Sequence, residues 1–359
     1  MSVRIGIIGV GWWATTNHLP LLAARPDVDL VAVCRPEADL AELVRAQFGV
    51  EHAFTDYREL LELDLDGVVI TSPHHVHYEH ASAALERGLH ILCEKPLTLD
   101  PGQAWELARI ARDADRIGLV PYGWNYAPFL VQAKKWIDDG LLGEIENVTC
   151  QMASPTKDFF GGDGVSVPSD FAATVVKPDP RTWQTPSQGG GYAHGQLTHA
   201  SALLFWLTGL QASRVTALTR STHAKVDMYD AAIVEFSNSA LGTLSGSATL
   251  PDDDKFQIDI RIFGSDGVLL LDVERERAEL RRHDGQHRAI EVPSGEGAYR
   301  CETPVHRFID LINGSEGANN SSLDIGARTV ELLAALHDSA ALDGTPVAVG
   351  VDGSVSSSS

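Results

Sequence analysis

Residues 3–14 read VRIGIIGVGWWA, a short β-branched and apolar run that leads directly into a GxGxxA loop. A stretch with helical apolar periodicity begins at about Thr15, so strand, glycine turn and helix follow in the order that the dinucleotide-binding fingerprint requires. In that fingerprint Gly9 permits the tight turn, Gly11 lets the backbone approach a pyrophosphate, and Ala14 lets the helix pack closely on the strand. The pyrophosphate would lie at the helix N-terminus, where backbone N–H groups favour an anion. The alternative is a plain strand-to-helix turn without a ligand.

The composition is that of an acidic globular chain, with 359 residues, 44% of them hydrophobic, and a formal net charge of −21. The length predicts two domains. Nucleic acid and anionic membrane surfaces select basic patches, so neither is expected as a partner. No apolar run reaches the roughly 18 residues of a membrane span, and a first strand at residue 3 leaves no room for a signal peptide, which predicts a cytoplasmic protein. The four cysteines are far apart in sequence and form no CxxC pair.

The chain shows two different patterns on either side of residue 122. Residues 1–122 alternate apolar strands with helices, which predicts an α/β Rossmann-type domain with a parallel sheet covered on both faces. Residues 123–352 contain a long Pro- and Gly-rich stretch and then strands separated by turn signals, which predicts an α/β domain with a largely antiparallel, open-faced sheet. A last helix at about 325–342 is free to pack back on the first domain, and residues 353–359 are expected to form a flexible tail. The open sheet face predicts a homodimer or homotetramer formed through the C-terminal sheet.

The tripeptide Glu94-Lys95-Pro96 directly follows a predicted buried strand. Ligands of open α/β sheets bind at the carboxyl ends of the strands, so this charged pair is expected to face the ligand crevice. Pro96 fixes its own φ and favours an extended conformation at Lys95, which makes the direction of the lysine reproducible. The alternative is a surface ion pair.

A triple glycine at 189–191 precedes a predicted helix that carries Gly195 and His199. Residues four apart share one face of an α-helix. A glycine inside a helix costs about 1 kcal/mol relative to alanine, so we expect a close approach of substrate, nicotinamide or another backbone at Gly195 to offset that cost. The alternative is a core histidine beside a glycine that serves helix packing.

In their order along the chain, these motifs resemble those of the Gfo/Idh/MocA oxidoreductases. The resemblance extends from Val3 to about Val349 and includes Gly143-Glu144-Ile145 at the opening of the second domain. The remaining motifs that carry it are Gly9-Val10-Gly11, Thr71-Ser72-Pro73 with His77, Glu94-Lys95-Pro96, Trp183, and the triple glycine before His199.

The resemblance implies an enzyme that uses NAD(P) to oxidise or reduce a secondary alcohol or ketone on a sugar, a sugar derivative or a cyclitol. It implies that Lys95 reaches the reacting oxygen and the nicotinamide, and that His199 is the general acid/base. A base with a pKa near 7 suits removal of the hydroxyl proton, and a lysine ammonium would stabilise the developing alkoxide.

Two departures from the family pattern concern the substrate side. The family has an acidic residue four positions before the histidine, whereas this chain has Gly195, so His199 has no carboxylate partner on its own helix. His194 could share or replace the role of His199. After Asn125-Tyr126 the usual arginine is also absent.

A third departure concerns the cofactor. The family often has an aspartate at the end of the second strand, where it binds the adenine ribose, and this chain has Arg35. An arginine suits a 2′-phosphate, which favours NADP over NAD. Glu37, two residues later, could still reach a ribose.

No metal is expected, because the histidine run 74–80 has no adjacent acidic or cysteine ligand, and His77 is better interpreted as lining the cofactor site. The catalytic residues are predicted to be Lys95 and His199. The cofactor is expected to contact Gly9, Gly11, Trp12, Trp13, Arg35, Thr71, Ser72, Pro73, His74, His77, Glu94, Lys95 and Asn125. The substrate is expected to contact Lys95, Tyr122, Asn125, Tyr126, Lys157, Asp158, Trp183, Tyr192, His194, Gly195 and His199.

Two other functions stay open at this point. One is a sensor that binds NAD(P) without turnover, which the glycine at position 195 favours and the presence of both Lys95 and His199 opposes. The other is a lyase or glycosidase that uses a tightly held NAD transiently. The sequence identifies neither the sugar nor the carbon that is oxidised.

Overall fold

A computed structural model describes residues 2–161 and 175–350, so the tail expected at 353–359 lies outside the described residues. Six parallel strands form the N-terminal sheet in the order β3-β2-β1-β4-β5-β6. The order reverses between β1 and β4, which is where an open α/β sheet binds its ligand. The strands are β1 (Val3–Ile8), β2 (Val28–Cys34), β3 (His52–Phe54), β4 (Gly67–Ile70), β5 (His90–Cys93) and β6 (Gly118–Leu119). The predicted parallel sheet is therefore confirmed.

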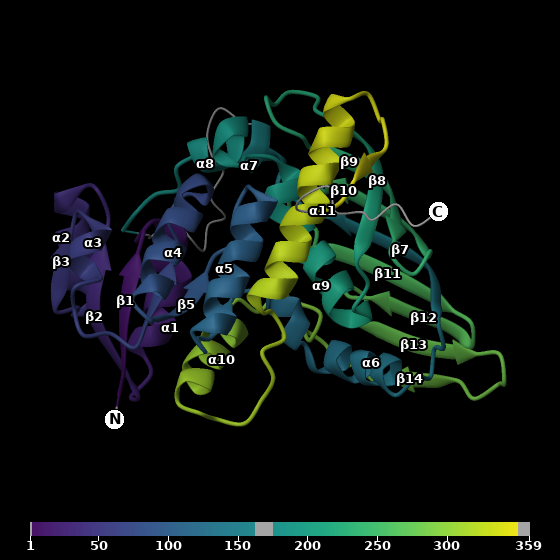
Figure 1. Cartoon of the computed structure of the whole chain (residues 1–359), viewed down its shortest axis with the longest axis horizontal. Helices are drawn as coiled ribbons and strands as arrows, with labels where there is room; N and C mark the ends of the chain where they lie inside the picture. Colours follow the sequence, from purple (N-terminus) through teal and green to yellow (C-terminus); the bar gives the residue numbers. More distant parts are fainter. Residues whose placement is uncertain (1, 162–174, 351–359) are drawn as a thin grey trace.

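Helices cover both faces of this sheet (Figure 1). One face packs against α3 (Tyr57–Leu60), α4 (His77–Glu86) and α5 (Pro101–Asp113). The other packs against α1 (Leu19–Ala23) and α2 (Ala38–Phe48). Burial on both faces explains why the strands are apolar almost throughout.

Two helices from the end of the chain also pack on this first domain. The helix α10 (Glu302–Ile312), which the sequence interpretation missed, buries Val305, Phe308 and Ile309 in the same core as β1. The start of α11 (Leu323–Ala341) packs on α5, and Gly118 makes room for it, since a Cβ there would lie 2.3 Å from Leu323 Cδ1. The first domain is therefore completed by segments from the end of the chain.

The second sheet has nine strands in the order β14-β13-β12-β11-β7-β10-β9-β8-β15. Only the β7–β10 pair is parallel among the described strands, so the predicted largely antiparallel sheet is confirmed. The strands are β7 (Ile145–Ala153), β8 (Ala212–Arg220), β9 (Tyr229–Phe236), β10 (Leu241–Ser247), β11 (Gln257–Gly264), β12 (Gly267–Asp272), β13 (Arg277–Arg282), β14 (Arg288–Ile290) and β15 (Val347–Ala348). One face packs on α6 (Pro128–Asp138), α9 (Thr198–Thr208) and the second half of α11.

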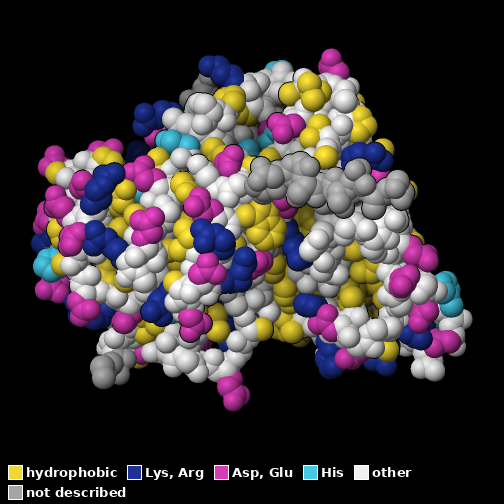
Figure 2. Space-filling model, in the orientation of Figure 1, with side chains coloured by type: hydrophobic (Ala, Val, Ile, Leu, Met, Phe, Trp, Pro, Cys, Tyr) yellow, Lys and Arg dark blue, Asp and Glu magenta, His cyan; other side chains and the backbone are white. Residues whose placement is uncertain are grey.

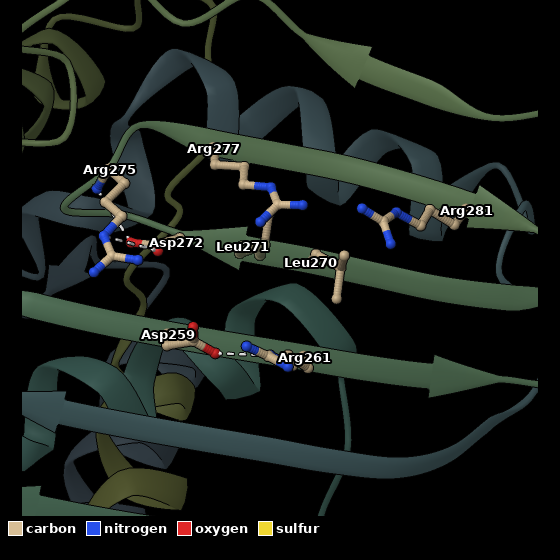
Figure 3. A pocket seen from close by; sticks show the side chains of 8 residues that line it. All are labelled: Asp259, Arg261, Leu270, Leu271, Asp272, Arg275, Arg277 and Arg281. Carbon is tan, nitrogen blue, oxygen red and sulfur yellow. Dashed lines mark hydrogen bonds and ion pairs between the residues drawn. The ribbon is translucent and has the colours of Figure 1, made fainter.

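The other face of this sheet is open in the single chain. Its strands alternate buried and exposed residues, and Ile233 is 55% and Leu241 51% exposed. Figure 3 shows a hollow on this face that is lined by four arginines, two aspartates and two leucines, among them the Arg261–Asp259 pair at 3.2 Å. Arginines therefore outnumber acids in the lining of this hollow, and two of them, Arg277 and Arg281, pair with Glu279 beside it.

Charged side chains of both signs are interspersed over the N-terminal half of the molecule in the view of Figure 2. Within residues 2–161 and 175–350, no helix is both long enough and apolar enough to cross a membrane.

Candidate active site

The loop after β1 depends on its two glycines. Gly9 has a φ of +92°, and a Cβ there would lie 2.3 Å from the backbone N of Ser72, at the end of β4. Thr71 fixes the loop by donating from Oγ1 to the Gly9 carbonyl O at 2.9 Å. A Cβ on Gly11 would meet only the Gly9 carbonyl O, at 3.7 Å, so the backbone at Gly11 is open to close approach. Such a bare backbone at the switch point of the sheet fits a pyrophosphate.

A π-helical turn at Ala14–His18 follows this loop and brings two side chains onto Glu94. Trp13 donates from Nε1 to Glu94 Oε1 at 2.8 Å, and His18 Nε2 lies 2.7 Å from the same oxygen. Burial works to raise the pKa of the Glu94 carboxyl, but the hydrogen bond to His18 and the charge of Lys95 outweigh it and hold the pKa below its ordinary value. Glu94 is therefore an ionised, 8% exposed anchor rather than half of a surface ion pair.

Lys95 crosses from the first domain to the second. Its Nζ donates to the carbonyl O of Gly195 at 2.8 Å. Burial lowers the pKa of the Lys95 ammonium, and the charge of Glu94 offsets only part of that effect. The side chain of Lys95 thus has a fixed direction and loses its proton more readily than an exposed lysine.

His77 lies beneath the Lys95 loop. It is fully buried, with Nδ1 2.8 Å from the Pro96 carbonyl O and Nε2 2.8 Å from the Ser72 carbonyl O. Because both ring nitrogens are taken up by backbone carbonyls, His77 ties the loops after β4 and β5 together. His74 is the histidine of this run that reaches the second domain, where its Nδ1 lies 3.0 Å from the Gly189 carbonyl O.

Three aromatic rings enclose His199, which is 5% exposed. The ring centroids of Tyr299, Trp124 and Tyr122 lie 5.0, 5.5 and 5.8 Å from that of His199, all edge-on. Burial, reinforced by the charge of Lys95, holds the pKa of His199 well below its ordinary value, so the imidazole is neutral at pH 7. Its Nδ1 has no hydrogen-bond partner among the described residues, so aromatic packing orients the ring in place of a carboxylate.

The expected approach of substrate or nicotinamide at Gly195 needs a correction. A Cβ on Gly195 would lie 2.8 Å from Cζ and 2.9 Å from Cε1 of Phe160, so a side chain of this protein fills the space. The segment Ala193–Leu197 is also π-helical, so the rule that residues four apart share a face does not carry over to Gly195 and His199.

His194 packs against a residue of α11 in this arrangement. Its ring stacks against that of His337 on α11, with centroids 4.7 Å apart, and burial together with His337 lowers the pKa of His194 to about 4. Asp227 completes this cluster, with Oδ1 3.3 Å from His337 Nε2 and Oδ2 accepting from the Ala193 backbone N at 2.7 Å. The cluster therefore holds the start of the π-helical turn.

The other predicted substrate residues divide into two groups. Trp183 is 6.0 Å from Trp12 and 5.3 Å from Phe159 between ring centroids, so it packs over the glycine loop, whereas Lys157 is half-exposed and pairs with Asp252 at 3.6 Å. Several buried polar groups bond to the scaffold. These contacts are Tyr122 OH to Thr198 Oγ1 (3.2 Å), Asn125 Nδ2 to Asn320 O (2.9 Å), Tyr126 OH to Ser321 Oγ (2.9 Å) and Tyr192 OH to Ser154 Oγ (3.2 Å).

Arg35 is already paired at the end of β2. Its Nη2 lies 2.7 Å from Glu37 Oε2, and its Nη1 donates to the Val10 carbonyl O at 3.1 Å. The hydrogen bond from Arg35 lowers the pKa of the Glu37 carboxyl. A 2′-phosphate at this position would therefore meet an acidic neighbour as well as a basic one.

Five residues of this site were not predicted from the sequence: His18, Trp124, Phe159, Phe160 and Tyr299. Each contacts the site through tertiary packing that no motif specifies. No group of three or more His, Cys, Asp or Glu side chains among residues 2–161 and 175–350 is arranged to hold a metal ion.

Comparison with known proteins agrees with this geometry. Residues 3–122 match the sequence model of the oxidoreductase family GFO_IDH_MocA, with its NAD-binding Rossmann fold, and residues 130–270 match the GFO/IDH/MocA C-terminal domain. The chain belongs to the GFO/IDH/MocA oxidoreductase family. The resemblance inferred from the motifs is thereby confirmed.

Curated relatives of the chain include several sugar and cyclitol dehydrogenases. Levoglucosan dehydrogenase of Pseudarthrobacter phenanthrenivorans is 25% identical over 314 residues, covering 78% of this chain and 76% of that protein. Inositol 2-dehydrogenase of Rhizobium meliloti is 25% identical over 313 residues, covering 86% and 83%. D-glucoside 3-dehydrogenase of Escherichia coli is 33% identical over 150 residues, and there the chain spans only 43% of the relative.

A solved structure of levoglucosan dehydrogenase in complex with NADH has the same fold. It superposes with a TM-score of 0.77 at 21% identity, covering 98% of this chain and all of that one. At this identity the likeness establishes the two-domain fold and nothing finer.

Proposed function

We propose that this family member is an NAD(P)-dependent dehydrogenase that oxidises a secondary hydroxyl, or reduces the matching ketone, on a sugar, a sugar derivative or a cyclitol. The observation that carries the proposal is that Lys95, at the carboxyl end of β5, reaches into the second domain and bonds to Gly195, in the π-helical turn that leads directly into the helix of His199. The named relatives that act on glucosides, levoglucosan and inositols support the substrate class.

The residues at the glycine loop fit a nicotinamide dinucleotide. The open backbone at Gly11 would face the pyrophosphate, and the ends of β4 and β5 would flank the nicotinamide half. When bound, the nicotinamide supplies the hydride acceptor or donor. Lys95 belongs to both the predicted cofactor and substrate contacts, because it lies where the two domains meet.

The proton chemistry falls to this chain's own residues. Neutral His199 accepts the hydroxyl proton: burial leaves its imidazole unprotonated at pH 7, and the same lowered pKa makes it a weaker base than a histidine with a pKa near 7. The Lys95 ammonium, held by the Gly195 carbonyl O, stabilises the negative charge that develops on the substrate oxygen. The rings of Tyr122, Trp124 and Tyr299 exclude water from His199. The charge of Lys95 acts on His199, whereas the ring of His194 packs against His337 on α11, so we assign the base to His199.

The cofactor preference is a finer proposal. We expect NADP(H) to bind more tightly than NAD(H) through Arg35, by a margin that the neighbouring carboxylate of Glu37 keeps small. The Arg35–Glu37 pair must open for a 2′-phosphate to reach the guanidinium.

We further propose that the open face of the C-terminal sheet is covered by a second copy of the chain. Ile233 and Leu241 lie on adjoining strands of that face and are more than half exposed. Apolar exposure of this kind marks interaction surfaces. Ile233→Glu is expected to lower the mass measured by light scattering from that of a dimer or tetramer to that of a monomer; a wild-type monomer would refute the proposal.

A substrate screen tests the proposed activity. Glucosides, anhydrosugars and inositols are each offered with NAD+ and with NADP+, and absorbance at 340 nm is followed. We expect at least one of these compounds to give a steady rate that Lys95→Met abolishes. Binding of cofactor without turnover of any compound would favour the sensor.

A further inference from the structure

The space beside Gly195 is occupied by one buried ring. Phe160, on the short helix α7 (Lys157–Gly161), is 1% exposed, and its Cζ and Cε1 lie within 3.0 Å of where a Cβ on Gly195 would be. The ring also packs edge-on against Tyr192, which precedes the turn that contains Gly195, at 5.9 Å between centroids. The ring thus contacts two residues at the π-helical turn, Tyr192 and Gly195.

The backbone at the same residue holds the candidate catalytic lysine. The carbonyl O of Gly195 accepts from Lys95 Nζ at 2.8 Å, within the π-helical turn Ala193–Leu197. Three titratable groups lie around this ammonium: Glu94 beside it, His74 on the turn before α4, and His199 on α9. The contact at position 195 is therefore a neutral carbonyl rather than a carboxylate.

These contacts define a structural role for Phe160. We propose that Phe160 is a positioning residue: its ring seats against Gly195, fixes the π-helical turn and shields the hydrogen bond between the Gly195 carbonyl O and Lys95 Nζ from water. The proposal rests on the proposed dehydrogenase function, because it concerns the direction of the lysine that faces the substrate oxygen. Phe160 itself touches neither of the candidate catalytic side chains in any described contact.

Two physical consequences follow from this arrangement. Loss of the ring leaves room beside a carbonyl and an ammonium, which is the kind of polar void that takes up water. Water there would ease the burial that lowers the pKa of Lys95, so that the pKa rises towards its ordinary value. Loss of the contact between the Phe160 ring and Gly195 also lets the π-helical turn move, and Lys95 would lose its fixed direction.

The first test compares Phe160→Leu with Phe205→Leu, a matched control. Phe205 is 2% exposed in the same core and comes from α9, but no described contact links it to Gly195 or His199. Carbamoylation of Lys95 by cyanate, measured by peptide mass spectrometry against pH, reports the pKa of this lysine without any substrate. We expect Phe160→Leu to raise the midpoint by at least about half a pH unit and Phe205→Leu to leave it unchanged.

The second test uses the steric contact itself. Leucine lacks the Cε1 and Cζ atoms that a Cβ at position 195 would meet. Phe160→Leu should therefore remove the steric clash that Gly195→Ala creates. We expect each single variant to lower kcat about tenfold, with little change in the Kd of the cofactor, and the double variant to be no worse than Gly195→Ala alone. Independent effects would instead multiply to about a hundredfold.

The outcomes separate this proposal from the proposed function. If no sugar or cyclitol is turned over, the dehydrogenase fails, while the cyanate measurement still decides whether Phe160 controls the environment of Lys95. An unchanged Lys95 midpoint in Phe160→Leu, or an equal shift in Phe205→Leu, would overturn the positioning role. So would a double variant whose losses multiply.

Discussion

The cofactor preference follows from a single charge pair and can be altered by one substitution. In the structure the Arg35 guanidinium contacts Glu37 Oε2 through both Nε (2.8 Å) and Nη2 (2.7 Å). A 2′-phosphate that bound Arg35 would gain a charge-assisted hydrogen bond worth about 1.5–3 kcal/mol. Glu37→Gln keeps the shape of the side chain and removes its charge, so it isolates the repulsion that the Glu37 carboxylate exerts on the phosphate.

The opposing term is the repulsion between the Glu37 carboxylate and the phosphate. At about 4 Å two unit charges repel by about 1 kcal/mol in water and about 4 kcal/mol at an effective dielectric constant of 20. The Glu37 side chain is 57% exposed, which places the repulsion near the lower figure. The remaining gain of about 0.5–2 kcal/mol predicts that the wild type prefers NADPH over NADH by about twofold to thirtyfold.

Fluorescence titration of NADPH and NADH against three variants tests this reasoning. Glu37→Gln should raise the Kd ratio in favour of NADPH by about fivefold to thirtyfold, from the removal of about 1–2 kcal/mol of repulsion. Arg35→Asp should reverse the preference. Glu42→Gln is the control, because Glu42 lies on α2, the helix that begins directly after Glu37, but pairs with Arg45. Equal or tighter binding of NADH by the wild type, or an unchanged ratio in Glu37→Gln, would refute the account.

Three other predictions concern the catalytic pair and a buried acid. Lys95→Met and His199→Ala should each lower kcat at least about a hundredfold and leave the Kd of the cofactor almost unchanged, and near-normal turnover in either would remove that residue from the mechanism. Burial lowers the pKa values of both Lys95 and His199. The pH profile of kcat/KM should therefore show no inflection where histidine ordinarily titrates, and it should fall at an alkaline pH below the ordinary lysine range. Lys95→Arg should abolish that alkaline fall. Burial and the charge of Asp227 raise the pKa of Asp230. The stability that comes from protonated Asp230 is therefore present at low pH and is lost as the pH rises through that raised value. Asp230→Asn should raise Tm at pH 8 but not at pH 4, as measured by differential scanning calorimetry.

The N-terminal half of the molecule could be predicted well because its signals are local. The glycine loop and the apolar strands are short contiguous patterns, and Gly9 is required by its own φ and by contact with the next strand. The helix α10 was missed, although Val305, Phe308 and Ile309 have helical spacing. The core that it fills lies on β1, about 300 residues earlier, and nothing near α10 in sequence points to it.

The candidate site was predictable in its residues and not in its contacts. The missing side chain at Gly195 is visible in the sequence, but Phe160, which fills the space, lies 35 positions away on a segment without a motif. The orientation of His199 depends on rings from two other segments, among them Tyr299. Tertiary packing sets such contacts, and no periodicity or spacing encodes them.

The central claim is that a hydride passes from the substrate carbon to the nicotinamide cofactor. A deuterium label on that carbon measures this transfer most directly. A substrate from the screen is prepared with deuterium on the carbon that bears the reacting hydroxyl, and the reduced cofactor is analysed by mass spectrometry. The account predicts one deuterium in each reduced cofactor and one ketone formed per cofactor reduced, with Lys95→Met and His199→Ala depressing both together. Substrate consumed without net reduced cofactor would contradict the account and indicate transient use of the cofactor by a lyase or glycosidase.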